Sequence, residues 1–199
     1  MMNMWLSPSY NYDRKKMVVM RIKTIATVIA AISLSAFGLT AAASAAPAAK
    51  APPPPAKTAD LRVWLGIGPG ERAAGSTYYP LEFTNVSGHT VTIRGYPGVS
   101  AVRGGSQLGS PAIWGHAKVL PTVTLASGAT AHATLQIVNA YNFGGLKVAT
   151  ATALRIYPPN QKSATYIDFT FPALVKKGTP YMSVSGPIMP GTGIPGGTG

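Results

Sequence analysis

The sequence predicts an all-β protein. Runs of roughly four to eight residues with alternating apolar and polar side chains recur after residue 60, separated by turn residues. Gly and Pro are frequent, with 22 and 18 of 199 residues. No window of eleven or more residues in this part has helical periodicity. About eight to ten short strands favour an antiparallel β-sandwich of the immunoglobulin or fibronectin type. A small closed β-barrel is the alternative, because it has the same strand pattern.

The composition excludes several kinds of protein. The chain has no cysteine, so disulfides, thiolate metal sites and cysteine nucleophiles are absent and the core alone must hold the fold. Charged residues make up 11% and hydrophobic residues 46%, which is unlike a disordered chain. The net charge is +12, and the part of the chain after residue 24 carries +8 of it. A positive surface favours anionic partners in general.

The first 45 residues have the organisation of a signal peptide. Residues 15–23 are basic, residues 25–39 are apolar, and Ala43-Ser44-Ala45 has the small side chains that signal peptidase reads. The apolar run is shorter than the ~20 residues of a membrane span, and an uncleaved anchor is the alternative. Met17 or Met20 as the start would give a leader of ordinary length. We therefore expect a secreted or envelope-associated protein whose mature chain has no transmembrane span.

Two segments flank the predicted domain, residues 60–189. Residues 46–59 are rich in Ala and Pro, with four consecutive prolines at 52–55, which predicts an extended linker. Residues 190–199 are rich in Gly, Pro and Thr, and we expect them to be disordered. Residues 191–196 also match the Gly-x-Gly-x-x-Gly dinucleotide fingerprint. They open no helix, so we regard that match as fortuitous.

The domain is organised around residues 78–100. Alternating runs on either side of a polar turn at residues 85–89 predict two strands joined as a tight hairpin. The predicted inward residues are Tyr79, Leu81, Phe83, Val91 and Ile93. Glu82 is expected on the solvated face, and Pro80 indicates an edge strand or a bulge. A Gly-Tyr-Pro-Gly turn at residues 95–98 then redirects the chain.

Further strands are predicted before and after this pair. They lie at residues 61–67, 99–102, 119–125, 131–137, 154–156, 167–171 and 181–188. Residues 131–137 alternate most regularly. In residues 167–171 the inward side chains are Ile167, Phe169 and Phe171, and Asp168 is expected in solvent.

The sequence contains no convincing catalytic or metal-binding motif. His89, His116 and His132 lack ligand spacing and cysteine partners. Glycosidase chemistry would require two of the few carboxylates to converge, and no Gly-x-Ser-x-Gly elbow occurs. We therefore expect neither enzyme activity nor a metal or cofactor. Lys176-Lys177 is the only basic pair of the mature region, so nucleic-acid binding is not expected either.

Aromatic residues in the predicted domain give a candidate binding surface. Trp64, Trp114 and Tyr141 could stack on sugar rings if they gathered on one side. The alternative is that the tryptophans belong to the core or fill loops. Asn85-Val86-Ser87 is a formal glycosylation sequon, but an asparagine at this position also makes an ordinary turn, which is the interpretation we prefer.

Several of these segments resemble an actinobacterial family called Domain of Unknown Function 4232. The similarity lies in residues 75–90, in the Gly-Tyr-Pro-Gly-Val-Ser run at 95–100, and in residues 123–131 and 154–159. It covers about residues 60–188 and implies an exported or lipid-anchored envelope protein with a β-sandwich domain and no established activity. Members of the family often carry a cysteine where Val91 stands. Because this chain has valine there, the resemblance implies that apolar packing replaces a disulfide, which typically stabilises a fold by ~2–4 kcal/mol.

These observations lead to three hypotheses about function. The first is a secreted, non-enzymatic β-sandwich that binds an anionic cell-wall polymer or envelope glycan, or associates structurally in the envelope. The second is a carbohydrate-binding module that uses exposed Trp and Tyr side chains. The third is an uncharacterised hydrolase, which would need His116 or His132 to meet Glu82 or Asp168 in one cleft.

Overall fold

The computed structural model describes residues 51–66, 72–73 and 75–194. The predicted signal peptide, Ile67 and residues 195–199 lie outside these described residues. Within them, no helix is long and apolar enough to cross a membrane. The described part of the chain belongs to one compact unit, which spans residues 49–199.

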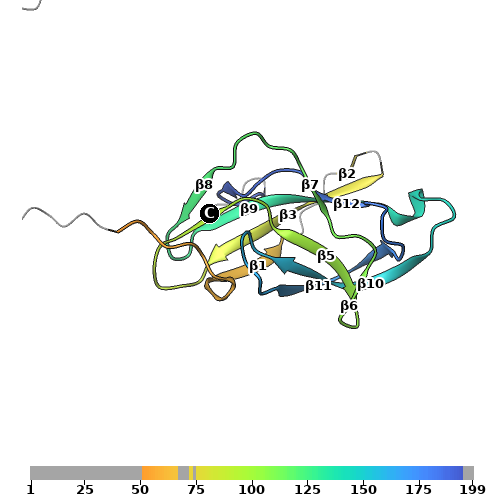
Figure 1. Cartoon of the computed structure of the whole chain (residues 1–199), viewed down its shortest axis with the longest axis horizontal. Helices are drawn as coiled ribbons and strands as arrows, with labels where there is room; N and C mark the ends of the chain where they lie inside the picture. The colour runs from red at the N-terminus through yellow and green to blue at the C-terminus, as the bar shows by residue number, and fades with distance from the viewer. Residues whose placement is uncertain (1–50, 67–71, 74, 195–199) are drawn as a thin grey trace, which may run out of the picture. The chain divides into compact units, whose positions relative to one another are not determined.

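The described strands form three sheets (Figure 1). The first sheet has the order β1 (Leu61–Leu65), β3 (Ser76–Asn85), β9 (Thr130–Val138), β12 (Met182–Val184) and β7 (Ile113–Trp114), with β2 (Arg72–Ala73) on β3 and β13 (Met189–Pro190) on β9. The second sheet has the order β11 (Thr165–Leu174), β10 (Val148–Tyr157), β5 (Gly98–Arg103) and β6 (Ser106–Leu108). The third sheet contains β4 (Val91–Arg94) and β8 (Thr122–Leu125), and two 3₁₀ helices, η1 (Thr58–Asp60) and η2 (Ala140–Asn142), complete the described elements.

The core lies between the sheets and is apolar. Phe83 of β3, Val91 of β4 and Ile156 of β10 come from three different sheets, are all fully buried, and belong to one cluster. Strand β9 alternates strictly between buried and half-buried residues, as its sequence predicts. The all-β sandwich is therefore confirmed. The described strands form open sheets and no closed barrel.

The predicted hairpin of residues 78–94 is wrong in its pairing. Strand β3 pairs with β1 and β9, whereas β4 pairs with β8, in the register Val91↔Leu125. Residues 86–90 therefore connect two sheets and do not close a hairpin. Since β3 has partners on both sides, Pro80 also lies in a central strand, just beyond the Leu65↔Leu81 end of β1. The Gly66 N–H, directly after β1, donates to the Pro80 carbonyl at 2.8 Å. The absent Pro80 N–H therefore removes a ladder hydrogen bond only at the last residue pair on this side, where a proline is tolerated.

The predicted linker ends earlier than residue 59. The Pro54 carbonyl accepts a hydrogen bond from the Thr92 N–H, and the Ala56 N–H donates to the Thr92 carbonyl, both at 2.8 Å. Ala56 is buried in the core cluster. The polyproline segment is extended, as expected, but from Pro54 onward it lies along the edge strand β4. The open edge of β4 offers backbone N–H and C=O groups, and these bind the polyproline segment, which would otherwise be a free spacer.

We expected disorder from Pro190 onward, whereas the structure places residues 190–194 against the first sheet. We call residues 189–194 the C-terminal strap. Its β13 pairs with β9, and a Cβ added to Gly66, next to the end of β1, would lie 3.0 Å from Ile194 Cγ1. The strap therefore crosses the outer face of the first sheet from β9 to β1. It covers Glu82, which is 0% exposed although the strand pattern placed it in solvent.

Tyr181 has the largest fully buried side chain among the residues that the structure describes, and its hydroxyl has no hydrogen-bond partner. We expect Tyr181→Phe to raise the free energy of unfolding by about 1 kcal/mol, because it removes an unsatisfied buried polar group.

Burial also raises the pKa of Tyr181 well above its ordinary value of 10.0. Stability linked to this group is therefore complete below pH 10 and declines as the pH rises above it. Urea denaturation of both proteins at pH 7 and pH 11 measures the two effects. A less stable phenylalanine variant would show that the hydroxyl has a partner.

Candidate aromatic binding pocket

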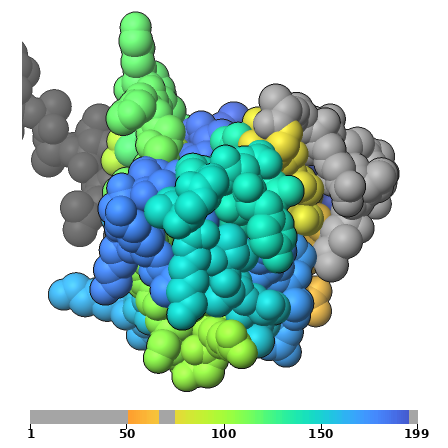
Figure 2. Space-filling view, turned by 90° about the vertical axis from the view of Figure 1, so that its right-hand side faces the viewer, coloured from red at the N-terminus to blue at the C-terminus, as the bar shows by residue number. Residues whose placement is uncertain are grey.

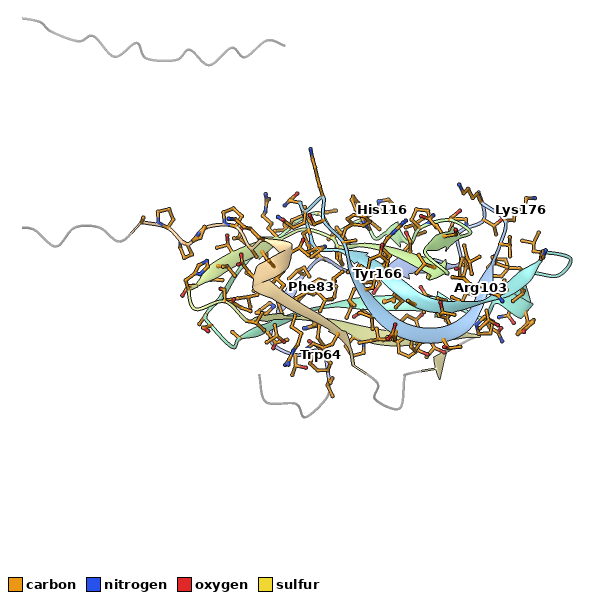
Figure 3. All side chains as sticks on the ribbon, turned by 90° about the horizontal axis from the view of Figure 1, so that it is seen from below. Trp64, Phe83, Arg103, His116, Tyr166 and Lys176 are labelled. Carbon is orange, nitrogen blue, oxygen red and sulfur yellow. The ribbon has the colours of Figure 1, made fainter. Side chains whose placement is uncertain are left out.

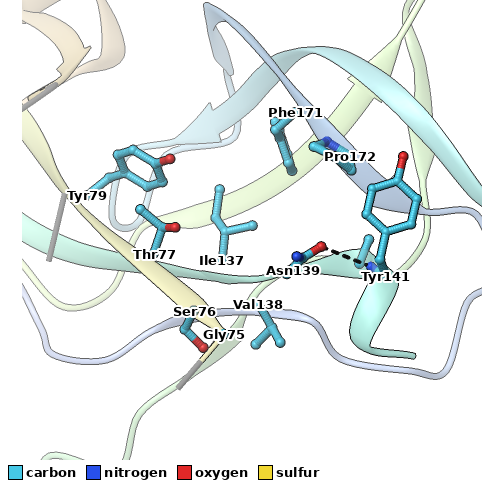
Figure 4. Close-up of a pocket in the computed structure, with 11 residues that line it drawn as sticks. Gly75, Ser76, Thr77, Tyr79, Ile137, Val138, Asn139, Tyr141, Phe171 and Pro172 are labelled. Atoms are coloured by element: carbon cyan, nitrogen blue, oxygen red, sulfur yellow. Dashed lines mark hydrogen bonds between the residues drawn. The ribbon is translucent and has the colours of Figure 1, made fainter. Parts of the chain in front are cut away.

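A pocket of about 490 Å³ opens at one end of the sandwich, between the first and second sheets. Its walls are the start of β3, the end of β9, helix η2 and the end of β11. Figure 4 shows Tyr79 and Tyr141 on opposite sides of the pocket, with Ile137 and Asn139 between them and Phe171 and Pro172 above in this view. The volume lies within the range of ~300–1,000 Å³ that is usual for small-molecule sites.

Local structure fixes the two tyrosines of the pocket in different ways. Asn139 caps η2 by accepting a hydrogen bond from the Tyr141 N–H on its Oδ1 at 3.1 Å, which holds Tyr141 at the rim with 70% of its side chain exposed. The Tyr79 ring packs edge-on against Phe169 at 5.1 Å between centroids, and Phe169 in turn contacts Phe171 at 5.3 Å. The inner aromatic is therefore packed against neighbouring rings, and the outer aromatic is accessible.

Polar groups are interspersed with the aromatic ones. Ser76, Thr77 and Asn139 line the same pocket, and the Ser76 hydroxyl accepts a hydrogen bond from Gln136 Nε2 at 3.0 Å. Among the described lining residues no side chain is acidic, basic or imidazole. The pocket thus offers ring faces and neutral hydrogen-bonding groups, and its described lining has no group suited to nucleophilic or general acid–base chemistry apart from hydroxyls.

Of the predicted surface residues, only Tyr141 lines this pocket. Trp64 is half-buried in β1, and its Nε1 donates to Thr84 Oγ1 at 3.1 Å. Trp114 in β7 is 55% exposed and stacks on Tyr96 at 5.9 Å. The structure does not bring the three aromatics together.

The strand registers explain why the two tryptophans diverge. Trp64 is paired with Glu82 on the outer face of the first sheet. Trp114 is paired with Val184, which is fully buried on the inner face. Figure 3 accordingly shows Trp64 on one side of the ribbon and His116, two residues after Trp114, on the other. A stacking surface made from both rings is therefore ruled out by the pairing.

The histidines are also separated. His89 lies exposed in the turn after β3, and His116 lies exposed after β7. His132 lies directly across from Glu82 in the register of β3 and β9, so the structure does bring one predicted acid and base together. Both lie under the C-terminal strap, and neither of them lines the pocket described above. The described residues also contain no group of three His, Asp or Glu side chains that could hold a metal ion.

The fold and the chain's turn segments agree with one known family. The family described as Domain of unknown function (DUF4232) matches residues 56–185. The chain belongs to this family. No curated protein and no solved structure matches it. The DUF4232 match begins at Ala56, where the chain first enters the core.

The Gly-Tyr-Pro-Gly turn within the DUF4232 region holds three segments together. The Gly95 carbonyl accepts a hydrogen bond from the Ile188 N–H at 2.9 Å. The Pro97 carbonyl accepts one from Trp114 Nε1 at 2.9 Å, and the Tyr96 hydroxyl accepts one from the Ala117 N–H at 3.0 Å. This turn is accordingly a structural junction, and it explains how Trp114 is held at the edge of the sheet.

Sequence reasoning missed most of the pocket. Tyr79 and Phe171 have the alternation of core residues, and nothing local shows that the sheets separate beside them. Asn139 gave a usable signal, because an asparagine before a short helical turn is a preferred cap. Tyr141 was singled out only because it is an aromatic residue of the predicted domain.

Proposed function

We propose that this protein is an exported, non-enzymatic binding module of the cell envelope that takes a segment of an anionic glycan in its aromatic pocket. The pocket carries the proposal. It places one exposed tyrosine ring opposite one fixed tyrosine ring, with hydroxyl and amide groups between them. Sugar rings present apolar faces and rims of hydroxyls, so this arrangement is complementary to them.

The charges near the pocket favour an anionic glycan over a neutral one. The Val175 N–H donates to the Lys147 carbonyl at 3.0 Å, so the loop that carries Lys147 lies beside the loop that carries Lys176 and Lys177. All three lysines are exposed. Figure 2 shows the segments around residues 145 and 176 gathered on the same face of the molecule. Figure 3 places Arg103 and Lys176 toward the same end.

The first test is retention of the protein on purified envelope polymers. We expect Tyr141→Ala to weaken retention about tenfold, because an aromatic contact is worth ~0.5–1.5 kcal/mol beyond the area it buries. Tyr166→Ala is the matched control, since Tyr166 is 57% exposed on the outer face of the second sheet, away from the pocket. Equal loss in both variants, or no loss in either, would contradict the pocket as the binding site.

The second test separates charge from stacking. Raising the salt from 0.1 M to 1 M shortens the Debye length from ~10 Å to ~3 Å, so retention of the wild-type protein should fall steeply. Substituting Lys147, Lys176 and Lys177 by Gln should remove most of this salt dependence. Lys57→Gln with Lys162→Gln, two exposed lysines outside the pocket end, should leave it unchanged. Salt-independent retention would contradict an anionic glycan while leaving a neutral one open to the Tyr141 test.

A further inference from the structure

Glu82 is an unusual residue to find beneath the C-terminal strap. Its side chain is fully buried, and Oε1 accepts two hydrogen bonds, from Thr192 Oγ1 at 2.9 Å and from the Gly193 N–H at 2.8 Å. Its other oxygen, Oε2, is buried without a hydrogen-bond partner. Burial of a carboxylate oxygen without a partner is unfavourable. Opening the strap would hydrate both oxygens. This hydration would offset part of the free energy that is lost when the strap's hydrogen bonds break.

The remaining contacts of the strap are hydrogen bonds to β9 and, at its end, packing of the half-buried Ile194 beside Gly66. His132 Nδ1 donates to the Gly191 carbonyl at 2.9 Å, and the Gly191 N–H donates to the Thr130 carbonyl at 3.0 Å. Pro190 has no N–H to contribute to the ladder with β9. Met189 is 44% exposed, and Pro190 is also exposed. The first half of the strap is therefore held to the sheet by hydrogen bonds, and its apolar burial is confined to Ile194 at the end.

The fit between strap and sheet is nevertheless specific. A Cβ added to Gly193 would lie 2.7 Å from Pro80 Cβ and 2.8 Å from His132 Cδ2, so only glycine allows this approach. The donor pair of Thr192 and Gly193 matches the single carboxylate oxygen below it. The strap thus behaves as an extended peptide ligand, which adds a short strand to β9 and is recognised by Glu82.

We propose that this site exchanges straps, so that residues 189–194 of one copy dock on Glu82 and β9 of a second copy of this chain. The strap sequence is the segment that the structure shows to fit, and every copy carries it. Exchange replaces each contact by an identical one, so it costs little in contact energy. A copy's own strap has the advantage of a high effective concentration. Exchange should therefore appear at high local concentration.

Complementation between two full-length variants tests the proposal. Gly193→Val spoils the strap but leaves the site intact. Glu82→Lys leaves the strap intact but replaces the acceptor by a cation that cannot accept from Gly193. Neither variant should self-associate. Mixed at equal concentration, they should form a 1:1 heterodimer, seen by light scattering. The Gly191 amide of the Glu82→Lys chain should then exchange with solvent at least about tenfold more slowly.

Two controls make each outcome decisive. Gly193→Val mixed with the double variant Glu82→Lys/Gly193→Val, which has no competent strap, should stay monomeric. A synthetic peptide of residues 189–194 should bind the Gly193→Val chain, shift its Trp64 indole N–H resonance and dissociate the heterodimer. A mixture that stays monomeric would overturn the proposal. If the peptide binds in that case, the open site accepts the free strap sequence but not the strap of a second copy, and if it does not bind, the strap is a fixed part of the sheet. None of these readouts depends on glycan retention.

Discussion

Ile93→Asp is expected to unfold the domain. Ile93 is only 4% exposed, lies in β4, and belongs to the core cluster that joins the three sheets. An aspartate there would lose the apolar contacts of the isoleucine and bury a charge without a partner, which costs several kcal/mol. A domain of this size has a total stability of only ~5–15 kcal/mol. Because the chain has no cysteine, no disulfide would hold the fold together. Far-UV circular dichroism during a thermal scan measures the effect.

Thr124→Asp is the matched control for this prediction. Thr124 is an exposed residue of β8, the strand paired with β4, so the same charge is placed in the same small sheet but in solvent. It should change the free energy of unfolding by less than about 0.5 kcal/mol. A folded Ile93→Asp protein beside an unfolded Thr124→Asp protein would mean that the two faces of this sheet are assigned the wrong way round.

The second large effect is expected for Asn85→Ala, with a loss of about 3 kcal/mol in the free energy of unfolding. Asn85 is fully buried where β3 passes into the connection to β4. Its Nδ2 donates to the carbonyls of His89 and Leu125 at 2.8 and 3.0 Å, and its Oδ1 accepts from the N–H and hydroxyl of Ser87. The substitution leaves buried groups unsatisfied, each at a cost of ~1–3 kcal/mol. Chemical denaturation monitored by fluorescence measures this loss.

Asn142→Ala serves as its control, because Asn142 is exposed and its Nδ2 makes a single long hydrogen bond of 3.4 Å to the Gly75 carbonyl. It should cost only a few tenths of a kcal/mol.

The hydrogen bonds of Asn85 also decide between the two interpretations of the sequon at residues 85–87. The Asn85 amide nitrogen is buried and already donates twice, so in the folded protein it acts as a turn residue. A loss below 1 kcal/mol in Asn85→Ala would contradict this structural role.

The aromatic pocket and the strap site lie at different parts of the same two strands. The pocket uses the start of β3 and the end of β9, whereas Glu82 and His132 lie nearer the other ends of these strands. Binding of a glycan and exchange of straps would therefore occupy separate surfaces. A module with both of the proposed properties would hold a polymer and also associate with other copies of this chain, and each property has its own test.

The amino-acid sequence by itself located most of the longer strands and their inward side chains, but it did not show β6 or β7, and it located only the last part of β10. The regular alternation of β9, the inward residues of β4, and the glycine- and proline-rich turns are local patterns with a period of two, and local patterns are what a sequence displays directly. The resemblance to the DUF4232 family also came from short local segments, and the match over residues 56–185 agrees with it.

Only the tertiary structure decided which strands pair and what covers their outer faces. The partner of β4 is β8, about thirty residues later, and not the adjacent β3. Glu82 has the position of a solvated residue, and it is buried only because a strap more than a hundred residues away crosses over it. The pocket likewise needs Tyr79, Tyr141 and Phe171 from three distant segments. Such contacts depend on chain reversal and packing between sheets, which no local periodicity encodes.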